Sequence, residues 1–284
     1  MYFRARSPGW DGTNSSHQEV APCVEPFYIG SVAADMKGPL FAVLLFASSL
    51  VPSSSIAWGS KGHEIIVRLA LQIMKPDERM AVFDLLGTDN PKTIGNWADW
   101  QRKNQPETKP WHYVNIPANV ERYKESRDCQ ETCIISQLEW AKAIIRDHRY
   151  SKPHRREALL WWFHLVGDLY QPFHCYEKND GGNDVILSFK GKKTNLHKLW
   201  DEDIIKSQNC SIAGIDSILL SSYEVPETIP DFVEAANLSH SRAIEAVLPK
   251  GSKVTDSYIR RWWPIILRSF WQAACMAAVM GPEI

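Results

Sequence analysis

From Trp58 to the end of the chain, apolar residues recur at helical spacing. Between Gly62 and Met74 they fall at intervals of three and four residues, which places them on one face of an amphipathic helix. The same spacing predicts seven further helices, which cover Pro76–Gly87, Thr93–Lys103, Ile134–His148, Pro153–Gln171, Leu196–Ser207, Pro230–Leu248 and Thr255–Met280. We expect Pro264 to break the last of these, because proline removes a backbone hydrogen bond inside a helix.

Only one segment is patterned as a β-strand. The residues Asp184–Lys190 read DVILSFK, and glycines stand on both sides of them. We therefore predict a mainly α, single-domain fold with one small β-hairpin. Tryptophan is frequent in this chain, and at helical spacing in a compact domain most of these rings are expected in the core.

The first 57 residues are excluded from the predicted fold. No apolar period is sustained before Met36, which is followed by Lys37, an apolar run at 39–51 and small residues up to Ala57. This order is typical of a secretory signal peptide. We predict a translation start at Met36 and cleavage after Ala57, with residues 58–284 as the mature domain. A membrane anchor is the alternative, but the run is shorter than the ~20 residues that span a bilayer.

The predicted mature domain has no net charge. The 57 removed residues hold three of the 32 basic and four of the 33 acidic residues, so equal numbers remain. Proteins that hold polyanions by surface charge alone are usually basic. Recognition of phosphate would therefore depend on a local positive site, and bound metal ions could supply that charge.

Five cysteines remain in the mature domain, so at least one has no partner within it. Cys129 and Cys133 are close in sequence, and neither a second cysteine pair nor a nearby histidine follows them. We predict a disulfide across a tight loop rather than half of a zinc site. A bond between Cys210 and Cys275 is a further hypothesis, on weaker grounds.

The chemistry is concentrated in histidine and aspartate pairs. His164 and Asp168 are four residues apart on one helical face, and His174 follows the turn at the end of that helix. The spacing recurs in His197 and Asp201. One such pair is usually an exposed ion pair or a structural histidine, but two pairs joined by a third histidine indicate a metal site.

Other candidate ligands occur in short aromatic segments. Asp99 lies in NWADW, and His112 lies in WHYVNIP. Cleavage after Ala57 would free the α-amino group of Trp58 five residues before His63. A free amine and its own carbonyl can chelate one ion.

Together these segments resemble the S1/P1 nucleases, a family that prefers single strands. The resemblance covers nearly all of the mature domain and implies a mainly α fold with three Zn²⁺ ions, whose ligand positions are all filled here. It implies one ion held by Asp99, His112, His164 and Asp168, a second held by His174, His197 and Asp201, and a third held by His63, Asp168 and the amine and carbonyl of Trp58.

The resemblance also implies an activity. We expect a secreted or periplasmic, monomeric endonuclease that hydrolyses single-stranded DNA and RNA to 5′-phosphate products, with 3′-nucleotidase activity on mononucleotides as a further expectation. The nucleophile would be a metal-bound hydroxide. Asp99 would orient it, and Arg102, one helical turn on, would clamp the phosphate. No stable membrane association is expected, since Arg268 and Gln272 interrupt the apolar C-terminal helix.

Substrate-binding positions follow from the same resemblance. Tyr113 stands where the family stacks an aromatic ring on a base, and Asn183 matches a glycine-glycine-asparagine turn that contacts substrate. Asn115 replaces a carboxylate of the family, so base preference should differ. Lys192 replaces a second stacking tyrosine of some fungal members. The pair Cys129 and Cys133 resembles a short bridge of the family.

Two other functions remain open from the sequence. The bacterial-type zinc phospholipases C share the fold, the N-terminal tryptophan and much of the ligand set, but they carry glutamate where this chain has Asp201 and lack the combined NWADW and WHYVNIP segments. A non-catalytic protein that binds metal or nucleotide is the second alternative, although every ligand position is filled.

Overall fold

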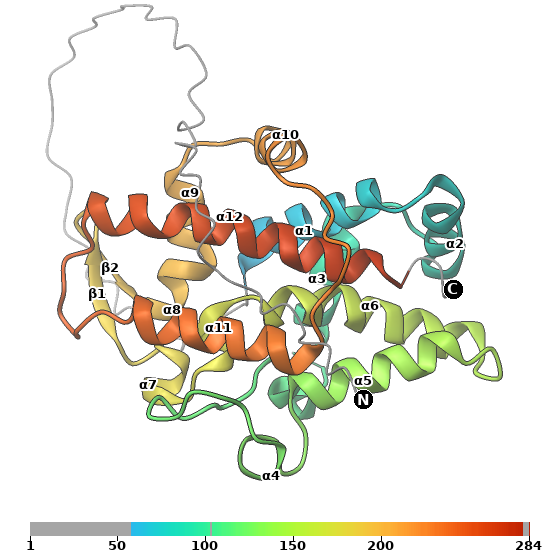
Figure 1. The fold of residues 1–284 in the computed structure, drawn as a ribbon, viewed down its shortest axis with the longest axis horizontal. Helices are drawn as coiled ribbons and strands as arrows, with labels where there is room; N and C mark the ends of the chain where they lie inside the picture. The colour runs from blue at the N-terminus through green and yellow to red at the C-terminus, as the bar shows by residue number, and fades with distance from the viewer. Residues whose placement is uncertain (1–57, 103, 281–283) are drawn as a thin grey trace, which may run out of the picture.

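Helix α6 (Lys152–Leu169) lies at the centre of the fold, and its residues from Ala158 to Leu169 are all buried. The structure is a computed structural model that describes residues 58–102, 104–280 and 284. Helix α5 (Ile134–Arg146) forms a hairpin with α6, while α1 (Gly59–Ile73), α3 (Pro91–Gln101) and α12 (Asp256–Ala278) pack around its remaining faces (Figure 1). Side chains from these helices share one hydrophobic core, which includes the adjacent pairs Trp161 with Trp162 and Trp262 with Trp263.

Local chemistry marks the ends of the outer helices. Asn90 caps α3 by accepting a hydrogen bond from the backbone N–H of Thr93. Side-chain caps of the same kind begin α10 (Ile212–Ser222), α11 (Phe232–Ala246) and α12. Helix α2 (Pro76–Leu86) has proline in its first turn and ends at Gly87, whose left-handed φ of 65° suits glycine.

The predicted fold class is confirmed. Strands β1 (Ile186–Phe189) and β2 (Lys192–Asn195) form a two-stranded antiparallel sheet, in which Phe189 pairs with Lys192. Lys190 and Gly191 make the turn, both with positive φ, as a two-residue hairpin requires. The short elements are η1 (Pro106–His112), α4 (Glu125–Asp128), η2 (Pro172–Cys175), α7 (Lys178–Gly181), α8 (Leu196–Lys198), the π-helical turn η3 (Leu199–Asp203) and α9 (Ile204–Ser207).

One expectation about the helices is wrong. Helix α12 runs through Pro264 without ending, because its buried face, including Trp263 and Leu267, packs against α1 and α6 along its length. The segment expected to be helical from Leu196 to Ser207 is helical throughout: α8, η3 and α9 follow one another without a break, with the π-helical turn η3 in the middle. Helix α10 was not predicted, although Ser211 is a usual helix cap and apolar residues follow it at helical spacing.

The cysteines confirm one expectation and correct another. Cys129 and Cys133 form a disulfide. Cys210 is disulfide-bonded as well, but Cys275 is a buried free thiol, so the pairing of Cys210 with Cys275 is wrong. The expected signal peptide lies outside the described residues.

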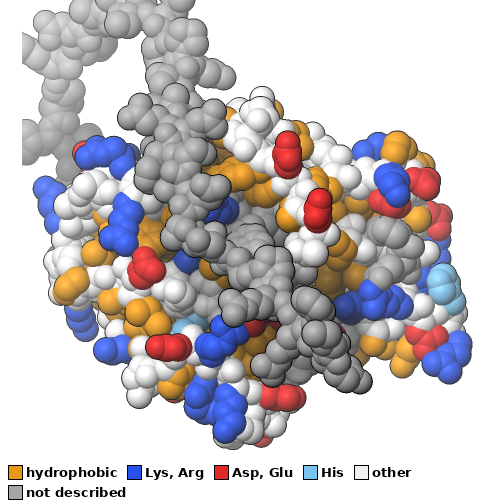
Figure 2. All heavy atoms as spheres, in the orientation of Figure 1, with side chains coloured by type: hydrophobic (Ala, Val, Ile, Leu, Met, Phe, Trp, Pro, Cys, Tyr) orange, Lys and Arg blue, Asp and Glu red, His pale blue; other side chains and the backbone are white. Residues whose placement is uncertain are grey.

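Basic and acidic side chains are interspersed on the face shown in Figure 2, which agrees with a chain of nearly balanced charge. Within the described part of the chain, no helix combines the length and the apolar character that crossing a bilayer requires.

Candidate metal centre

Five acidic and imidazole side chains meet beside the buried end of α6, and we call them the first cluster. They come from four elements: His63 from α1, Asp99 from α3, His112 from the end of η1, and His164 and Asp168 from α6. The helical spacing puts His164 Nε2 3.2 Å from Asp168 Oδ2. The other members are more than 50 residues away from this pair along the chain, so packing of the helices brings them in.

Asp168 lies between three imidazoles. Its Oδ2 atom is 2.8 Å from His112 Nδ1 and faces His164, while its Oδ1 atom is 3.2 Å from His63 Nε2. Asp99 Oδ1 stands 3.8 Å from His164 Nε2. One carboxylate thus presents its two oxygens to two different groups of nitrogen atoms, which is the geometry that a bridging ligand needs.

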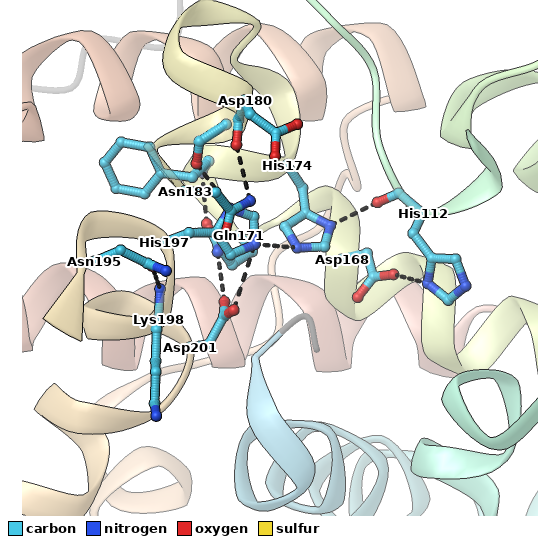
Figure 3. Close-up of polar contacts among 12 residues, drawn as sticks. His112, Asp168, Gln171, His174, Asp180, Asn183, Asn195, His197, Lys198 and Asp201 are labelled. Carbon is cyan, nitrogen blue, oxygen red and sulfur yellow. Dashed lines mark hydrogen bonds and ion pairs between the residues drawn. The ribbon is translucent and has the colours of Figure 1, made fainter. Parts of the chain in front are cut away.

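The second cluster consists of His174 from η2, His197 from α8 and Asp201 from η3 (Figure 3). The Nε2 atoms of the two imidazoles are 3.1 Å apart, and His197 Nε2 is 3.3 Å from Asp201 Oδ2. All three side chains are buried. Asp201 lies in the π-helical turn η3, a rare conformation that is frequent at functional sites.

Backbone carbonyls orient three of the rings. The Nδ1 atoms of His164, His174 and His197 lie 2.6 to 2.7 Å from the carbonyl oxygens of Gly95, His112 and Gly181, respectively. Because a carbonyl only accepts, each Nδ1 must donate its proton, and each neutral ring then carries its lone pair on Nε2.

The second cluster fits a cation. Burial lowers the pKa of His174 to about 3 and that of His197 to about 4, so both rings are neutral near pH 7. Their Nε2 lone pairs then face each other at 3.1 Å, beside a carboxylate oxygen that has no hydrogen-bond partner among the described residues. Burial raises the pKa of Asp201 well above its usual range, so without an ion this carboxyl keeps a proton. A cation bound by the two imidazole lone pairs and the carboxylate would take the place of that proton.

Charge is distributed differently in the first cluster. Burial disfavours the imidazolium of His164, but the charges of Asp168 and Asp99 outweigh it and raise its pKa to about 9. Burial likewise disfavours the carboxylate of Asp168, yet the charge of His164 helps to hold its pKa well below the usual range. The side chains alone therefore form an ion pair, and a metal cation would take the place of the proton on His164.

Two helical glycines make room for His63, and sequence reasoning missed both. A Cβ atom added at Gly167 in α6 would lie 2.8 Å from His63 Nδ1, and one at Gly95 in α3 would lie 2.8 Å from the His63 carbonyl oxygen. His63 is stacked on His164, with ring centroids 4.0 Å apart. A glycine within an apolar helical pattern, as in LVGD, is the signal that could have pointed to them.

The predicted substrate residues lie near the first cluster. Arg102 Nη1 is 3.5 Å from Asp99 Oδ1. Tyr113 is half-buried, and burial raises the pKa of its hydroxyl. The negative charge of Asp180 raises this pKa further, whereas the positive charge of Arg102 lowers it, because both charged side chains lie near the ring. A hydrogen bond from Val114 N to His174 O holds this segment beside the second cluster.

The other predicted positions are more peripheral. The Asn115 side chain is exposed, and Asn183 Nδ2 donates to the carbonyl oxygen of Asp180 over 2.8 Å. Lys192 is exposed on β2. Trp58 is fully buried, and its carbonyl oxygen accepts the hydrogen bond from Gly62 N that opens α1.

Comparison with known proteins shows the family of this chain. The model of the family described as S1/P1 Nuclease matches residues 58–280. The chain belongs to the S1/P1 nuclease family. Among its relatives are Endonuclease 2 of Arabidopsis thaliana, 29% identical over 173 residues, Nuclease S1 of Aspergillus oryzae, 27% identical over 178 residues, and Nuclease P1 of Penicillium citrinum, 29% identical over 154 residues.

These alignments are partial on both sides. They cover 55%, 58% and 51% of this chain and 58%, 59% and 57% of the three relatives, in the same order. The chain thus spans somewhat under two thirds of the length of the curated relatives that it matches. Family membership rests on the match to the family model, which covers most of the chain.

Proposed function

We propose that this chain is a secreted, zinc-dependent endonuclease that hydrolyses the phosphodiester bonds of single-stranded DNA and RNA to 5′-phosphate products and also acts on 3′-mononucleotides. The observation that carries the proposal is the second cluster, where both imidazoles are neutral and His197 Nε2 lies 3.1 Å from His174 Nε2 and 3.3 Å from Asp201 Oδ2. Membership of the S1/P1 nuclease family supports the choice of nucleic acid as the substrate.

The donor atoms favour zinc. Imidazole nitrogen and carboxylate oxygen are common zinc ligands, and the orienting carbonyls are the outer partners that such histidines usually have. We propose three ions, with the ligand sets Asp99, His112, His164 and Asp168; His174, His197 and Asp201; and Trp58, His63 and Asp168. When bound, such ions supply Lewis-acid chemistry that lowers the pKa of water and neutralises charge on phosphate.

The remaining residues of the site have roles of their own in the proposal. Asp99 accepts a hydrogen bond from the attacking water and orients it. The guanidinium of Arg102 donates to phosphate oxygens as charge builds on them, from its position beside Asp99. Tyr113 stacks on a base, the amide of Asn115 meets a base edge with a donor as well as an acceptor, and Asn183 contacts the substrate.

A substrate panel tests the proposal. Purified protein is given single-stranded DNA, single-stranded RNA, duplex DNA, a 3′-mononucleotide and phosphatidylcholine vesicles, each with and without a chelator. We expect the first two to be cleaved fastest, activity to be lost with the chelator, and zinc to restore it. Hydrolysis of the lipid alone would show a phospholipase C, and metal binding without any hydrolysis would show a non-catalytic protein.

One substitution tests the proposed role in base recognition. Asn115→Asp restores the carboxylate that the family resemblance places at this exposed position. We expect the release of nucleotides from a mixed-sequence strand to change in base preference, while the metal content stays the same. An unchanged base preference would remove Asn115 from the proposed site.

Export is part of the same proposal. Cleavage after Ala57 would leave Trp58 as the first residue, and the match to the family model also begins there. Sequencing the N-terminus of exported protein tests this, since a first residue other than Trp58 would contradict the cleavage site.

A further inference from the structure

One buried glutamine between the two clusters contacts candidate ligands in both. Gln171 lies in the turn between α6 and η2, and its side chain is 0% exposed. Its backbone N–H donates to the carbonyl oxygen of Asp168 over 2.9 Å, and its own carbonyl oxygen accepts from His174 N over 3.0 Å. Backbone hydrogen bonds of this residue therefore join the first cluster to the second.

The side chain of Gln171 makes a third connection, with a defined orientation. Its Oε1 atom accepts a hydrogen bond from Phe173 N at 2.5 Å. Because a backbone N–H only donates, this contact fixes which end of the amide is oxygen. The amide nitrogen Nε2 then donates to Asp201 Oδ1 at 2.6 Å (Figure 3).

This contact distinguishes the two oxygens of Asp201. Oδ1 is occupied by the amide N–H, whereas Oδ2 lies 3.3 Å from His197 Nε2 and has no hydrogen-bond partner among the described residues. Oδ2 is thus the oxygen that lies beside His197 and is left to accept from a further group. A carboxylate free to rotate could offer either oxygen or both.

We infer that Gln171 is a positioning residue, which holds Asp201 so that Oδ2 alone faces the metal and which keeps the second cluster in register with the first. The inference rests on the proposed function, because it assumes that the second cluster holds an ion. Hydrogen-bonded partners of ligating carboxylates typically change metal affinity about 10- to 100-fold when they are removed.

Two substitutions separate this role from a general effect on folding. Gln171→Glu has the same shape and keeps an acceptor for Phe173 N, but it turns an oxygen instead of an N–H toward Asp201. Gln171→Met removes both hydrogen bonds. The matched control is Ser239→Ala, because the buried Ser239 hydroxyl donates to Leu169 O at the end of the same helix and contacts neither cluster in any described hydrogen bond.

The experiment measures metal rather than turnover. Zinc-loaded wild-type protein and the three variants are mixed with a chromophoric chelator, and the rate and number of ions released are followed; thermal unfolding of chelator-treated samples reports the fold. We expect one ion to leave about 10- to 100-fold faster from both Gln171 variants. Ser239→Ala should lower the unfolding temperature while releasing its ions at the wild-type rate.

Each outcome has a distinct meaning. Release from Gln171→Met at the wild-type rate would overturn the inference while leaving the proposed function intact. Faster release from Ser239→Ala as well would also overturn it, because the effect would then come from a loosened fold. Wild-type protein that takes up no zinc would overturn the proposed function and this inference together.

Discussion

Adding one methyl group at Gly167 tests how closely the first cluster depends on helix packing. The Cβ atom of Gly167→Ala would lie 2.8 Å from His63 Nδ1 and 3.0 Å from its Cε1, whereas ordinary contacts begin near 3.4 Å. The ring would have to move by about 0.6 Å. Since His63 is stacked on His164 and is fully buried, it has little space to do so.

The expected change in stability is small because two effects oppose each other. Alanine favours the interior of a helix over glycine by about 1 kcal/mol. Overpacking a buried site costs about 1 to 3 kcal/mol. The free energy of unfolding should therefore fall by about 0 to 2 kcal/mol, from the difference between these terms. Displacing His63, a proposed ligand, should nevertheless weaken zinc binding by about tenfold or more, which is at least the effect of disturbing a group that only orients a ligand.

Urea unfolding of chelator-treated protein measures the free energy of unfolding, and zinc counting by atomic spectroscopy after equilibration with a competing chelator measures the zinc affinity. Gly214→Ala is the control, because Gly214 lies in the outer helix α10 and only Ser211 Oγ, at 3.2 Å, is near its added Cβ. It should keep all its zinc. Gly95→Ala should lower both the free energy of unfolding and the zinc affinity more than Gly167→Ala does, since its Cβ meets the backbone of His63. Full zinc content in Gly167→Ala would refute the packing argument.

Three further predictions address other parts of the chain. Asp168→Ala should lose two zinc ions at once, whereas Arg102→Ala should keep its zinc and lose turnover about 10²- to 10³-fold. Metal counts and a nuclease assay measure these two effects. An Asp168 variant that lost only one ion would contradict the bridging role. Protein that begins at Trp58 should hold one more zinc ion and be more active than protein with a single extra residue before it, and equal zinc content would exclude the amine as a ligand. Burial raises the pKa of the Cys275 thiol to about 12, against 9.0 for an ordinary thiol. Its alkylation in folded protein at pH 8 should therefore be about 10³-fold slower than in urea, and the rate should rise with pH. Rapid labelling of Cys275 in the native protein would refute its burial.

Local spacing predicted much of the fold and the pairs within the site. The repeat of apolar residues marked the principal helices apart from α10, and glycines marked the hairpin. The pairs His164 with Asp168 and His197 with Asp201 were visible because residues four apart share a helical face, and the structure places each pair within 3.3 Å. The π-helical turn at Asp201 could not be predicted from the spacing of residues, because it depends on how the chain packs rather than on residue type.

Proline and cysteine show where local rules are insufficient. A proline inside a helix is unfavourable by about 3 kcal/mol in isolation, but α12 continues through Pro264 because burial of its apolar face outweighs that penalty. The partner of a cysteine depends on which segments meet in space. Sequence distance therefore predicted the bond between Cys129 and Cys133 but not the state of Cys210 or Cys275.

Residue identity and spacing were thus enough to predict a helical protein with a metal site, and the resemblance of its motifs to the S1/P1 nucleases supplied the family and the full set of candidate ligands. Packing alone brings His63 and His112 to Asp168. It also places Gly95 and Gly167 against His63, and it turns the Gln171 side chain toward Asp201 in the second cluster. The reason is physical: helical geometry acts over about four residues, whereas contacts between residues tens of positions apart exist only once the shared core has formed.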